Sequence, residues 1–211
     1  MNKRKIRKMS PLHNDEKRSL LQIARMSIES VLVHRDPPQF PPPTGNLASP
    51  HGAFVTLHYR GRLRGCIGRV ASVDPVAAVV ADCAVAAATG DPRFPRLKPS
   101  DLHDLEIEVS VLSRPERVGP EEVQPGIHGL VISQGERRGV LLPQVAIRYR
   151  WSRENFLQET CLKAGLDPEA WRSPGTSIEI FTAEVFSEVD CAPPPDDGGS
   201  AASATPYSSS Q

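Results

Sequence analysis

Residues 51–70 read HGAFVTLHYRGRLRGCIGRV, and this stretch decides the fold. Residues 54–59 alternate in polarity and are rich in β-forming side chains, Arg60 and Gly61 suit a tight turn, and residues 62–70 return in the same manner. Two such runs joined by a two-residue turn predict a β-hairpin. We therefore expect antiparallel sheet at the centre of the fold.

A helix and another strand are predicted to follow this hairpin. Asp74 is suited to cap the helix, Pro75 to fill its first position and Gly90 to end it. Residues 106–112 then alternate as a strand, with one apolar side and one more polar side. The two sides are Ile107, Val109 and Val111, and Glu108, Ser110 and Leu112.

The second half of the chain repeats this order of elements at offsets of 74–78 residues. A hairpin over residues 130–142 precedes a helix that is capped near Ser152 and ended by Gly165, and a strand over residues 178–186 comes last. The matched positions are His51-Gly52 with His128-Gly129, Arg64-Gly65 with Arg138-Gly139, Cys83 with Cys161, and Asp91-Pro92 with Asp167-Pro168. This shared order predicts a single α+β domain of two related hairpin-helix-strand halves around antiparallel sheet.

The segments outside the repeat differ in composition. Residues 14–33 carry apolar side chains at helical spacing and predict an N-terminal amphipathic helix. Residues 37–50 hold six prolines and are expected to form an extended connector. We expect the domain to span residues 11–189, with a disordered basic start over 1–10 and a disordered tail rich in Pro, Gly and Ser over 190–211.

The overall composition excludes several classes of protein. The chain has 211 residues, of which 39% are hydrophobic and 24% are charged, so it is neither a coiled coil nor collagen. Its formal net charge is zero, which gives no bulk attraction to a polyanion. The basic start is not followed by an apolar run, and no stretch reaches the ~20 apolar residues of a membrane span. We expect a cytoplasmic protein with reduced cysteines.

Comparison of the two halves singles out Cys66. Cys83 and Cys161 occupy equivalent helix faces and are expected to be core side chains. Cys191 falls in the expected tail. Cys66 alone lies on a hairpin strand, and its counterpart in the second half is Val140.

Two arginines share the strand of Cys66. Alternation predicts that Arg62, Arg64 and Cys66 lie on one face, with Leu63 and Ile67 on the core face. A nearby guanidinium stabilises a thiolate, which predicts a reactive thiol with Arg64 as its partner. The alternative is a buried structural cysteine, with the arginines in water.

Four more residues are candidates around this thiol. Gly65 and Gly68 leave space for a backbone or a ligand to approach. Arg93 could bind a carboxylate or phosphate, or else pair with Asp91. His128, in a loop before a strand, is a candidate for proton transfer, although many loop histidines are satisfied structurally.

Other kinds of site receive little support. The dinucleotide-binding, Walker, zinc-protease and serine-hydrolase motifs are missing. Four side chains could form a metal site without any diagnostic spacing: Cys66, His51, His58 and His128. Residues 53–73 contain four arginines and no acid, a surface that could meet RNA or a nucleotide: Arg60, Arg62, Arg64 and Arg69.

The sequence resembles the AMMECR family over residues 20–188. The strings that carry the resemblance are LRGCIG at residues 63–68, DPRFP at 91–95, His128-Gly129, and LLPQV at 141–145. Bacterial and archaeal members are also called system protein A of the AmmeMemoRadiSam gene cluster. The resemblance implies an internally duplicated α+β fold and possible partners, a Memo-like protein and a radical SAM enzyme. It implies site residues at Arg64, Gly65, Cys66, Gly68, Arg93, Phe94, His128 and Gln144.

Three functions remain open on these grounds. The first is a thiol-dependent enzyme or enzyme subunit in which Cys66 is nucleophile or ligand, Arg64 stabilises it and His128 transfers protons. Arg93, Phe94 and Gln144 would then help to bind a ligand that is not identified. The second is a non-catalytic scaffold for the Memo-like and radical SAM partners, and the third is an RNA- or nucleotide-binding protein.

Overall fold

The computed structural model describes residues 10–33 and 36–191. Its first helix is α1 (Asn14–Val33), which begins and ends where the sequence predicts. Leu20, Ala24 and Ile28 are fully buried on one side of α1, because residues three and four apart share a helix face. The helix therefore lies on a sheet with its apolar stripe inward.

That sheet has four antiparallel strands in the order β2-β1-β3-β8. β1 (Gly52–Tyr59) and β2 (Arg62–Arg69) form the expected hairpin, with Arg60 and Gly61 at φ values of 50° and 72° in its turn. β3 (Leu105–Leu112) pairs with β1 on one side and with β8 (Ala183–Ser187) on the other. The predicted hairpin and third strand are thus confirmed.

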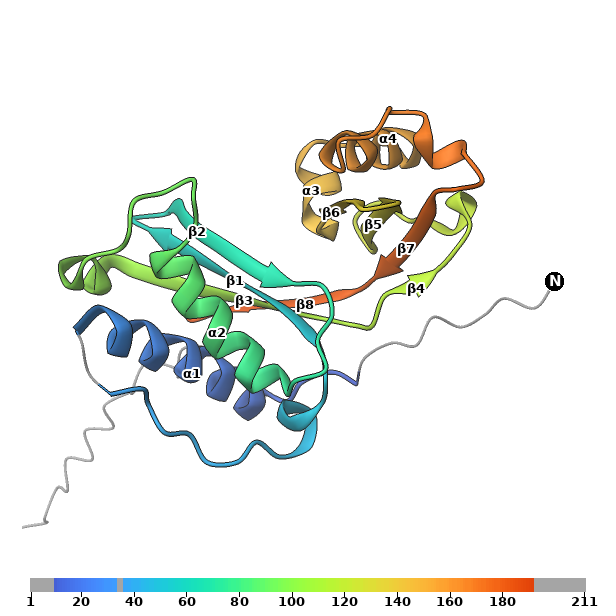
Figure 1. Cartoon of the computed structure of the whole chain (residues 1–211). Helices are drawn as coiled ribbons and strands as arrows, with labels where there is room; N and C mark the ends of the chain where they lie inside the picture. Colours follow the sequence, from blue (N-terminus) through green and yellow to red (C-terminus); the bar gives the residue numbers. More distant parts are fainter. Residues whose placement is uncertain (1–9, 34–35, 192–211) are drawn as a thin grey trace, which may run out of the picture.

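Two helices cover only one face of this first sheet. α2 (Val76–Thr89) lies against β1 and β2, and α1 lies beside α2 (Figure 1). The N-cap of α2 is Pro75. The helix therefore begins one residue later than the predicted cap at Asp74 implies. No helix of residues 10–33 and 36–191 covers the opposite face of the first sheet, and we call it the open face.

The second sheet repeats the arrangement in the order β4-β7-β5-β6. Its hairpin is β5 (Gly129–Gln134) with β6 (Arg137–Leu141), and its longest helix is α4 (Arg153–Lys163), which packs on both strands. Ser152 caps α4 as predicted, because its Oγ accepts a hydrogen bond from the backbone N–H of Asn155 at 3.2 Å. The remaining elements of this half are α3 (Pro143–Arg148), β4 (Glu116–Arg117) and β7 (Ser177–Phe181).

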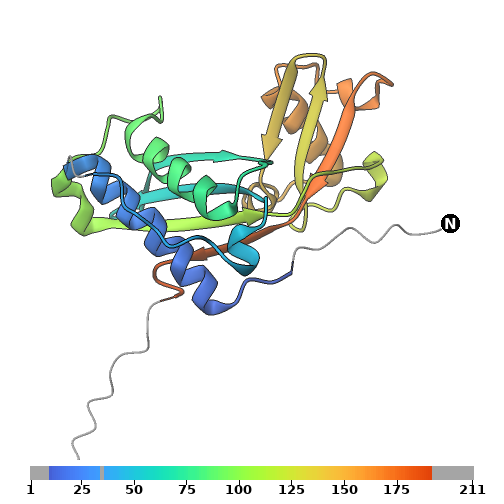
Figure 2. The ribbon, with the colours of Figure 1, turned by 60° about the horizontal axis from the view of Figure 1, so that its bottom comes forward.

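The last strand of each half belongs to the sheet of the other half. The chain of β3 continues into β4 of the second sheet, and the chain of β7 continues into β8 of the first, as Figure 2 shows. The strand predicted over residues 178–186 is therefore two strands that belong to different sheets. The two crossing segments hydrogen-bond at the junction, where the N–H of Ser113 donates to the carbonyl of Thr182 at 2.9 Å.

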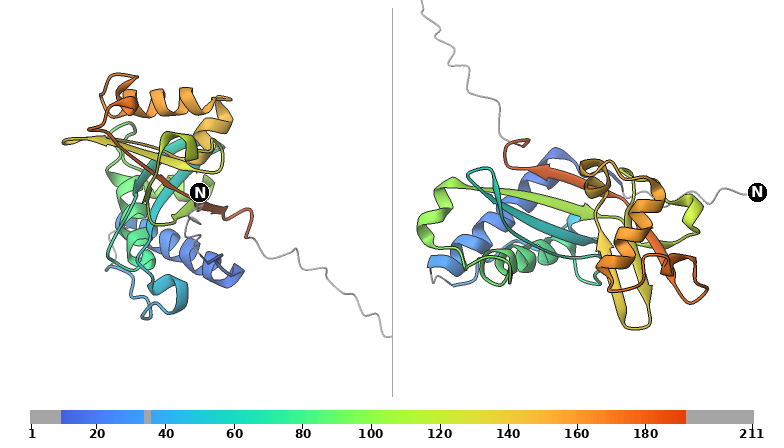
Figure 3. Two further views of the ribbon diagram at one scale, coloured as in Figure 1. Left: turned by 90° about the vertical axis from the view of Figure 1, so that its right-hand side faces the viewer. Right: turned by 90° about the horizontal axis from the view of Figure 1, so that it is seen from above.

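The exchanged strands join the two sheets into one domain. The helices α1 and α2 lie at one end of the molecule and α4 lies at the other, with the strands between them (Figure 3, left). A small buried cluster of Leu112, Val131 and Phe181 joins the halves, and Phe54 and Val70 pack against it. The predicted α+β fold of two related halves is confirmed, with two sheets in place of one.

Short 3₁₀ helices and ordered ends complete the described chain. The 3₁₀ helices are η1 (Gly45–Ala48), η2 (Pro99–Asp104), η3 (Pro120–Glu122) and η4 (Ala170–Arg172). The proline-rich connector is tied to α1, because the side chain of Asn46 donates to Glu16 at 3.0 Å. Near the end of the described residues, Cys191 packs against the first core.

The expected disorder of residues 1–9 and 192–211 lies outside the described residues. Within the described ranges, no helix has both the length and the apolar character that a membrane span requires.

Candidate functional site

Cys66 lies on the open face of the first sheet. Its cross-strand neighbours form one row, Cys66 on β2, Thr56 on β1, Glu108 on β3 and Ser187 on β8. Residues in register across antiparallel strands project to the same face, and the alternate residues Val55 and Val109 belong to the core beneath the helices. The half-exposed thiol therefore projects away from the core under α1 and α2.

One ion pair, Asp91 with Arg93, binds both backbone polar groups of Cys66. Its N–H donates to Asp91 Oδ2 at 2.8 Å, and its carbonyl oxygen accepts from Arg93 Nη2 at 3.0 Å. Side-chain hydrogen bonds of 2.7 and 3.0 Å join Arg93 to Asp91, and the backbone N–H of Arg93 donates to Asp91 Oδ1 at 3.1 Å. The Asp91 side chain is only 1% exposed. The edge of β2 is thus clamped at the residue that carries the thiol.

The clamp has clear electrostatic consequences. The hydrogen bond from Arg93 is the main reason that the pKa of Asp91 lies well below its ordinary value of 3.8. The same bond raises the pKa of Arg93, and the Cys66 side chain contributes to that increase. Arg93 is therefore a fixed cation beside Cys66, with its guanidinium also lying over the ring of Phe94 at 5.4 Å.

The thiol itself has one hydrogen-bond partner on the neighbouring strand. Because the N–H and carbonyl of Cys66 face the clamp, Cys66 and Thr56 form a non-hydrogen-bonded pair, in which side chains approach closely. The hydroxyl of Thr56 accordingly donates to Cys66 Sγ at 3.4 Å. Thr56 orients the sulfur within the open face.

The expected faces of Arg62, Leu63 and Arg64 are wrong. A bulge in β2 places Leu57 opposite Gly65 but His58 opposite Leu63, so Arg64 is an extra residue that interrupts the alternation. Leu63 is consequently 44% exposed rather than in the core. Arg64 Nη2 donates to the carbonyl of Arg96 at 3.4 Å, so the cation that contacts Cys66 is Arg93. A thiolate-stabilising role for Arg64 stays a prediction.

The two motif glycines allow close packing within the protein. A β-carbon at Gly65 would overlap the carbonyl oxygen of Ala87 in α2, and one at Gly68 would overlap the ring of Phe54. The space they leave is occupied by a helix backbone and by an aromatic ring. Their predicted contribution to ligand binding stays a prediction.

His128 lies in the second half and is only 2% exposed. Its Nδ1 accepts a hydrogen bond from the N–H of Gln124 at 3.2 Å, and burial lowers its pKa. No contact joins His128 to Cys66 among the described residues. Gln144 lies in α3, half-buried and likewise without a contact to the thiol. The structure thus does not bring these two residues to the Cys66 site.

The other cysteines provide an internal comparison. Burial raises the pKa of the Cys83 thiol to about 11 and also raises that of Cys161. Both belong to the hydrophobic cores, as predicted. Asp167, the counterpart of the buried Asp91, is exposed and bonds only its local turn, through the N–H of Glu169 at 2.8 Å. The clamp is therefore specific to the half that contains Cys66.

Sequence reasoning missed Glu108 and Ser110 on the open face and named His58 there only as a possible metal ligand. Glu108 is half-buried, and burial is the main cause of its raised pKa. His58 lies close enough to oppose that increase. Ser110, in the next row, is 1% exposed and its hydroxyl has no partner within the described structure. Alternation already placed Glu108 and Ser110 on the polar side of their strand, and this was the signal that could have found them.

The possible metal site gains no geometric support. In residues 10–33 and 36–191, no group of three or more His, Cys, Asp and Glu side chains is arranged to hold a metal ion. His51, one of its four candidates, places its Nδ1 at 3.0 Å from the carbonyl of Leu112.

Comparison with known proteins gives one family over most of the chain. Residues 21–186 match the AMMECR1 family. The chain belongs to this family. It is 42% identical to a protein of Methanothermobacter thermautotrophicus over 189 residues, which cover 86% of this chain and 98% of that protein. A protein of Methanopyrus kandleri is 40% identical over 82% of this chain and 89% of its own length.

A solved structure from the same comparison supports the architecture. The crystal structure of an uncharacterized protein from Pyrococcus horikoshii superposes with a TM-score of 0.74 at 38% identity. The match covers 80% of this chain and 89% of that chain. The AMMECR1 match therefore includes both sheets and the segments that hold Cys66 and Asp91.

Proposed function

We propose that this AMMECR1-family protein is a thiol-dependent enzyme or enzyme subunit in which Cys66 is the nucleophile or ligand. The observation that carries the proposal is the Asp91–Arg93 clamp, which fixes the backbone of Cys66 and keeps a guanidinium beside a thiol on the open face. A fixed cation favours the thiolate, which is the reactive form of cysteine. The four free thiols fit a reducing, cytoplasmic location.

The surrounding side chains suit a nucleophilic step. The Cys66 thiolate would form a bond to an electrophilic substrate carbon while the bond from that carbon to its leaving group breaks. The leaving group would take a proton from Glu108, which burial keeps protonated to higher pH than an ordinary glutamate. We assign this proton to Glu108 in preference to His128, because Glu108 lies in the cross-strand row of Cys66, whereas His128 is buried and bonds its own loop.

The alkylation rate of Cys66 at neutral pH tests the proposal. We expect iodoacetamide to label Cys66 faster than it labels a free cysteine, because the thiolate is the reactive form. Cys83 and Cys161 should stay unlabelled in the folded protein, because both are buried. Mass spectrometry of the digested protein measures each cysteine separately. A Cys66 that is inaccessible, or that reacts like a free cysteine, contradicts the proposal.

Two arginine variants identify the cation that matters. Arg93→Gln should slow the labelling of Cys66 at neutral pH, whereas Arg64→Gln should leave the rate unchanged, because, of these two arginines, only Arg93 bonds Cys66. Arg93→Lys keeps the charge and should restore part of the rate. An effect confined to Arg64→Gln would support the original sequence prediction.

Partners form a separate part of the proposal and rest on the resemblance alone. We propose that a Memo-like protein and a radical SAM enzyme act with this protein. Co-purification from the native source tests it, and recovery without either protein contradicts it. A scaffold role is favoured if the complex forms equally well with Cys66→Ala.

The nucleic-acid alternative is less well supported by the arginines. Arg60 pairs with Asp104 at 2.7 Å and Arg69 with Asp82 at 3.1 Å, so two of the four charges are already partly neutralised. Phosphate binding depends on such charges being available.

A further inference from the structure

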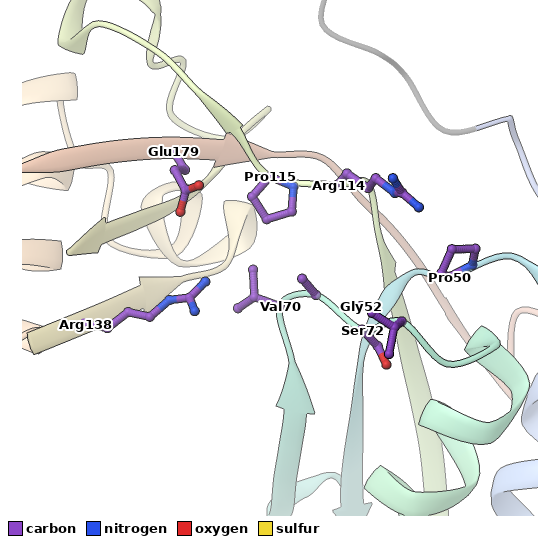
Figure 4. A pocket seen from close by; sticks show the side chains of 10 residues that line it. Pro50, Gly52, Val70, Ser72, Arg114, Pro115, Arg138 and Glu179 are labelled. Carbon is purple, nitrogen blue, oxygen red and sulfur yellow. The ribbon is translucent and has the colours of Figure 1, made fainter. Parts of the chain in front are cut away.

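A cavity of about 620 Å³ lies at the junction of the two halves, and we call it the junction pocket. It is bounded by the start of β1, the loop after β2, the crossing segment after β3, and strands β6 and β7 (Figure 4). Small-molecule sites commonly occupy about 300–1,000 Å³ and lie between domains or halves of a fold. The junction pocket has the size and location of such a site.

Two arginines line the junction pocket without an acidic partner. Arg114 comes from the crossing segment and Arg138 from β6, and Figure 4 shows their side chains on different sides of the pocket. No hydrogen bond or ion pair joins either guanidinium to a carboxylate of the described residues. Six other described arginines do pair with a carboxylate, among them Arg25 with Glu188, Arg93 with Asp91 and Arg172 with Glu154. Guanidinium groups left free around a cavity are suited to carboxylates and phosphates.

The remaining walls define what else the ligand must carry. Pro50, Val70 and Pro115 provide apolar surface, and Glu179 lies on the same side as Arg138 (Figure 4). Glu179 and Arg138 do not form an ion pair, so the carboxylate can accept a hydrogen bond from a ligand. Gly52 lies so close to the backbone of Val70 that a β-carbon would overlap it, so no side chain fits at residue 52 in this wall.

We propose that the junction pocket binds a small organic anion. The ligand carries a carboxylate or phosphate for Arg138 and Arg114, a hydroxyl or ammonium group for Glu179, and a short apolar part for the proline walls. Neither arginine lies on the Cys66 row, and Val70 follows that residue by four positions, about 13 Å along an extended strand. The inference therefore does not depend on the proposed thiol chemistry.

Calorimetric titration of the full chain with defined probes tests the proposal. The probes are inorganic phosphate, O-phosphoserine, glutarate and glutamate, each to about 10 mM, which detects even millimolar affinity. We expect saturable binding of at least one probe, tighter for those with an ammonium group, and weaker at high salt. Phosphoserine against glutamate separates a phosphate site from a carboxylate site.

Matched arginine variants locate the binding. Arg138→Ala and Arg114→Ala should each weaken binding about tenfold to hundredfold, because each removes a charge-assisted hydrogen bond. Arg62→Ala is the control, since Arg62 is an exposed arginine at the far end of β2. Thermal melting shows that each variant is folded. The proposal is overturned if no probe binds saturably, or if Arg62→Ala weakens binding as much as the pocket variants do.

Discussion

Gly65→Ala should lower the free energy of unfolding by about 2–3 kcal/mol, since the new β-carbon overlaps the backbone of α2 and forces strand and helix apart. Gly139→Ala should have an effect of similar size, because its β-carbon would lie 2.5 Å from the carbonyl oxygen of Thr160 in α4. Urea unfolding followed by circular dichroism measures both. Gly175→Ala is the control and should change stability by less than about 0.5 kcal/mol, because the space around Gly175 is open.

The same variants test whether the exchanged strands couple the halves. Both tryptophans, Trp151 and Trp171, lie in the second half, so their fluorescence reports on that half alone. Because β8 completes the first sheet and β4 completes the second, Gly65→Ala should shift the fluorescence transition as far as the circular dichroism transition. A fluorescence transition that stays at its wild-type midpoint would show that the halves unfold independently.

Asp91→Asn should cost about 2–4 kcal/mol of stability at neutral pH and should disturb the Cys66 site. The substitution removes the charge that pairs with Arg93 and weakens the acceptor for the Cys66 N–H. Both losses are costly because the Asp91 side chain is only 1% exposed. Urea unfolding gives the loss, and alkylation of Cys66 reports on the site. Asp167→Asn is the matched control in the second half, and should cost less than about 1 kcal/mol, since Asp167 is exposed.

The cost of Asp91→Asn should also depend on pH in a defined direction. The pKa of Asp91 is lower in the folded protein than its ordinary value of 3.8, so the carboxylate stabilises the fold fully above that value. The contribution is lost as the pH falls below 3.8 and through the lowered folded pKa. Wild type and variant should therefore converge in acid. A difference that is constant from neutral pH into acid would contradict the charged clamp.

Part of the site could be predicted because its signals are local. Cys66 was found by comparing the halves, and the strand around it by alternation. The bulge at Arg64 could not be predicted, because the residue types in this strand look the same with or without a bulge. The bulge nevertheless exchanges the faces of Arg62 and Leu63. Arg93 was named as a ligand-binding residue, yet its bond to Cys66 joins residues 27 positions apart.

The exchange of the last strands shows the same division. Residues 178–186 look like one strand because β7 and β8 are both extended, with a single residue, Thr182, between them. The sequence of residues 178–186 contains no signal that the chain passes from one sheet to the other at Thr182. Pairing partners in a sheet come from distant parts of the chain and are selected by packing.

The amino-acid sequence by itself determined the elements and their repetition: the amphipathic helix α1, the two hairpins, the cap at Ser152, the family, and the unusual position of Cys66. These follow from periodicity and turn chemistry, which act over a few residues. Only the tertiary structure decided which cation bonds the backbone of Cys66, that Glu108 and Ser110 share the face of its thiol, and that Arg114 and Arg138 line one cavity. Those results depend on contacts between residues far apart in the chain, which arise when the two sheets exchange strands and pack.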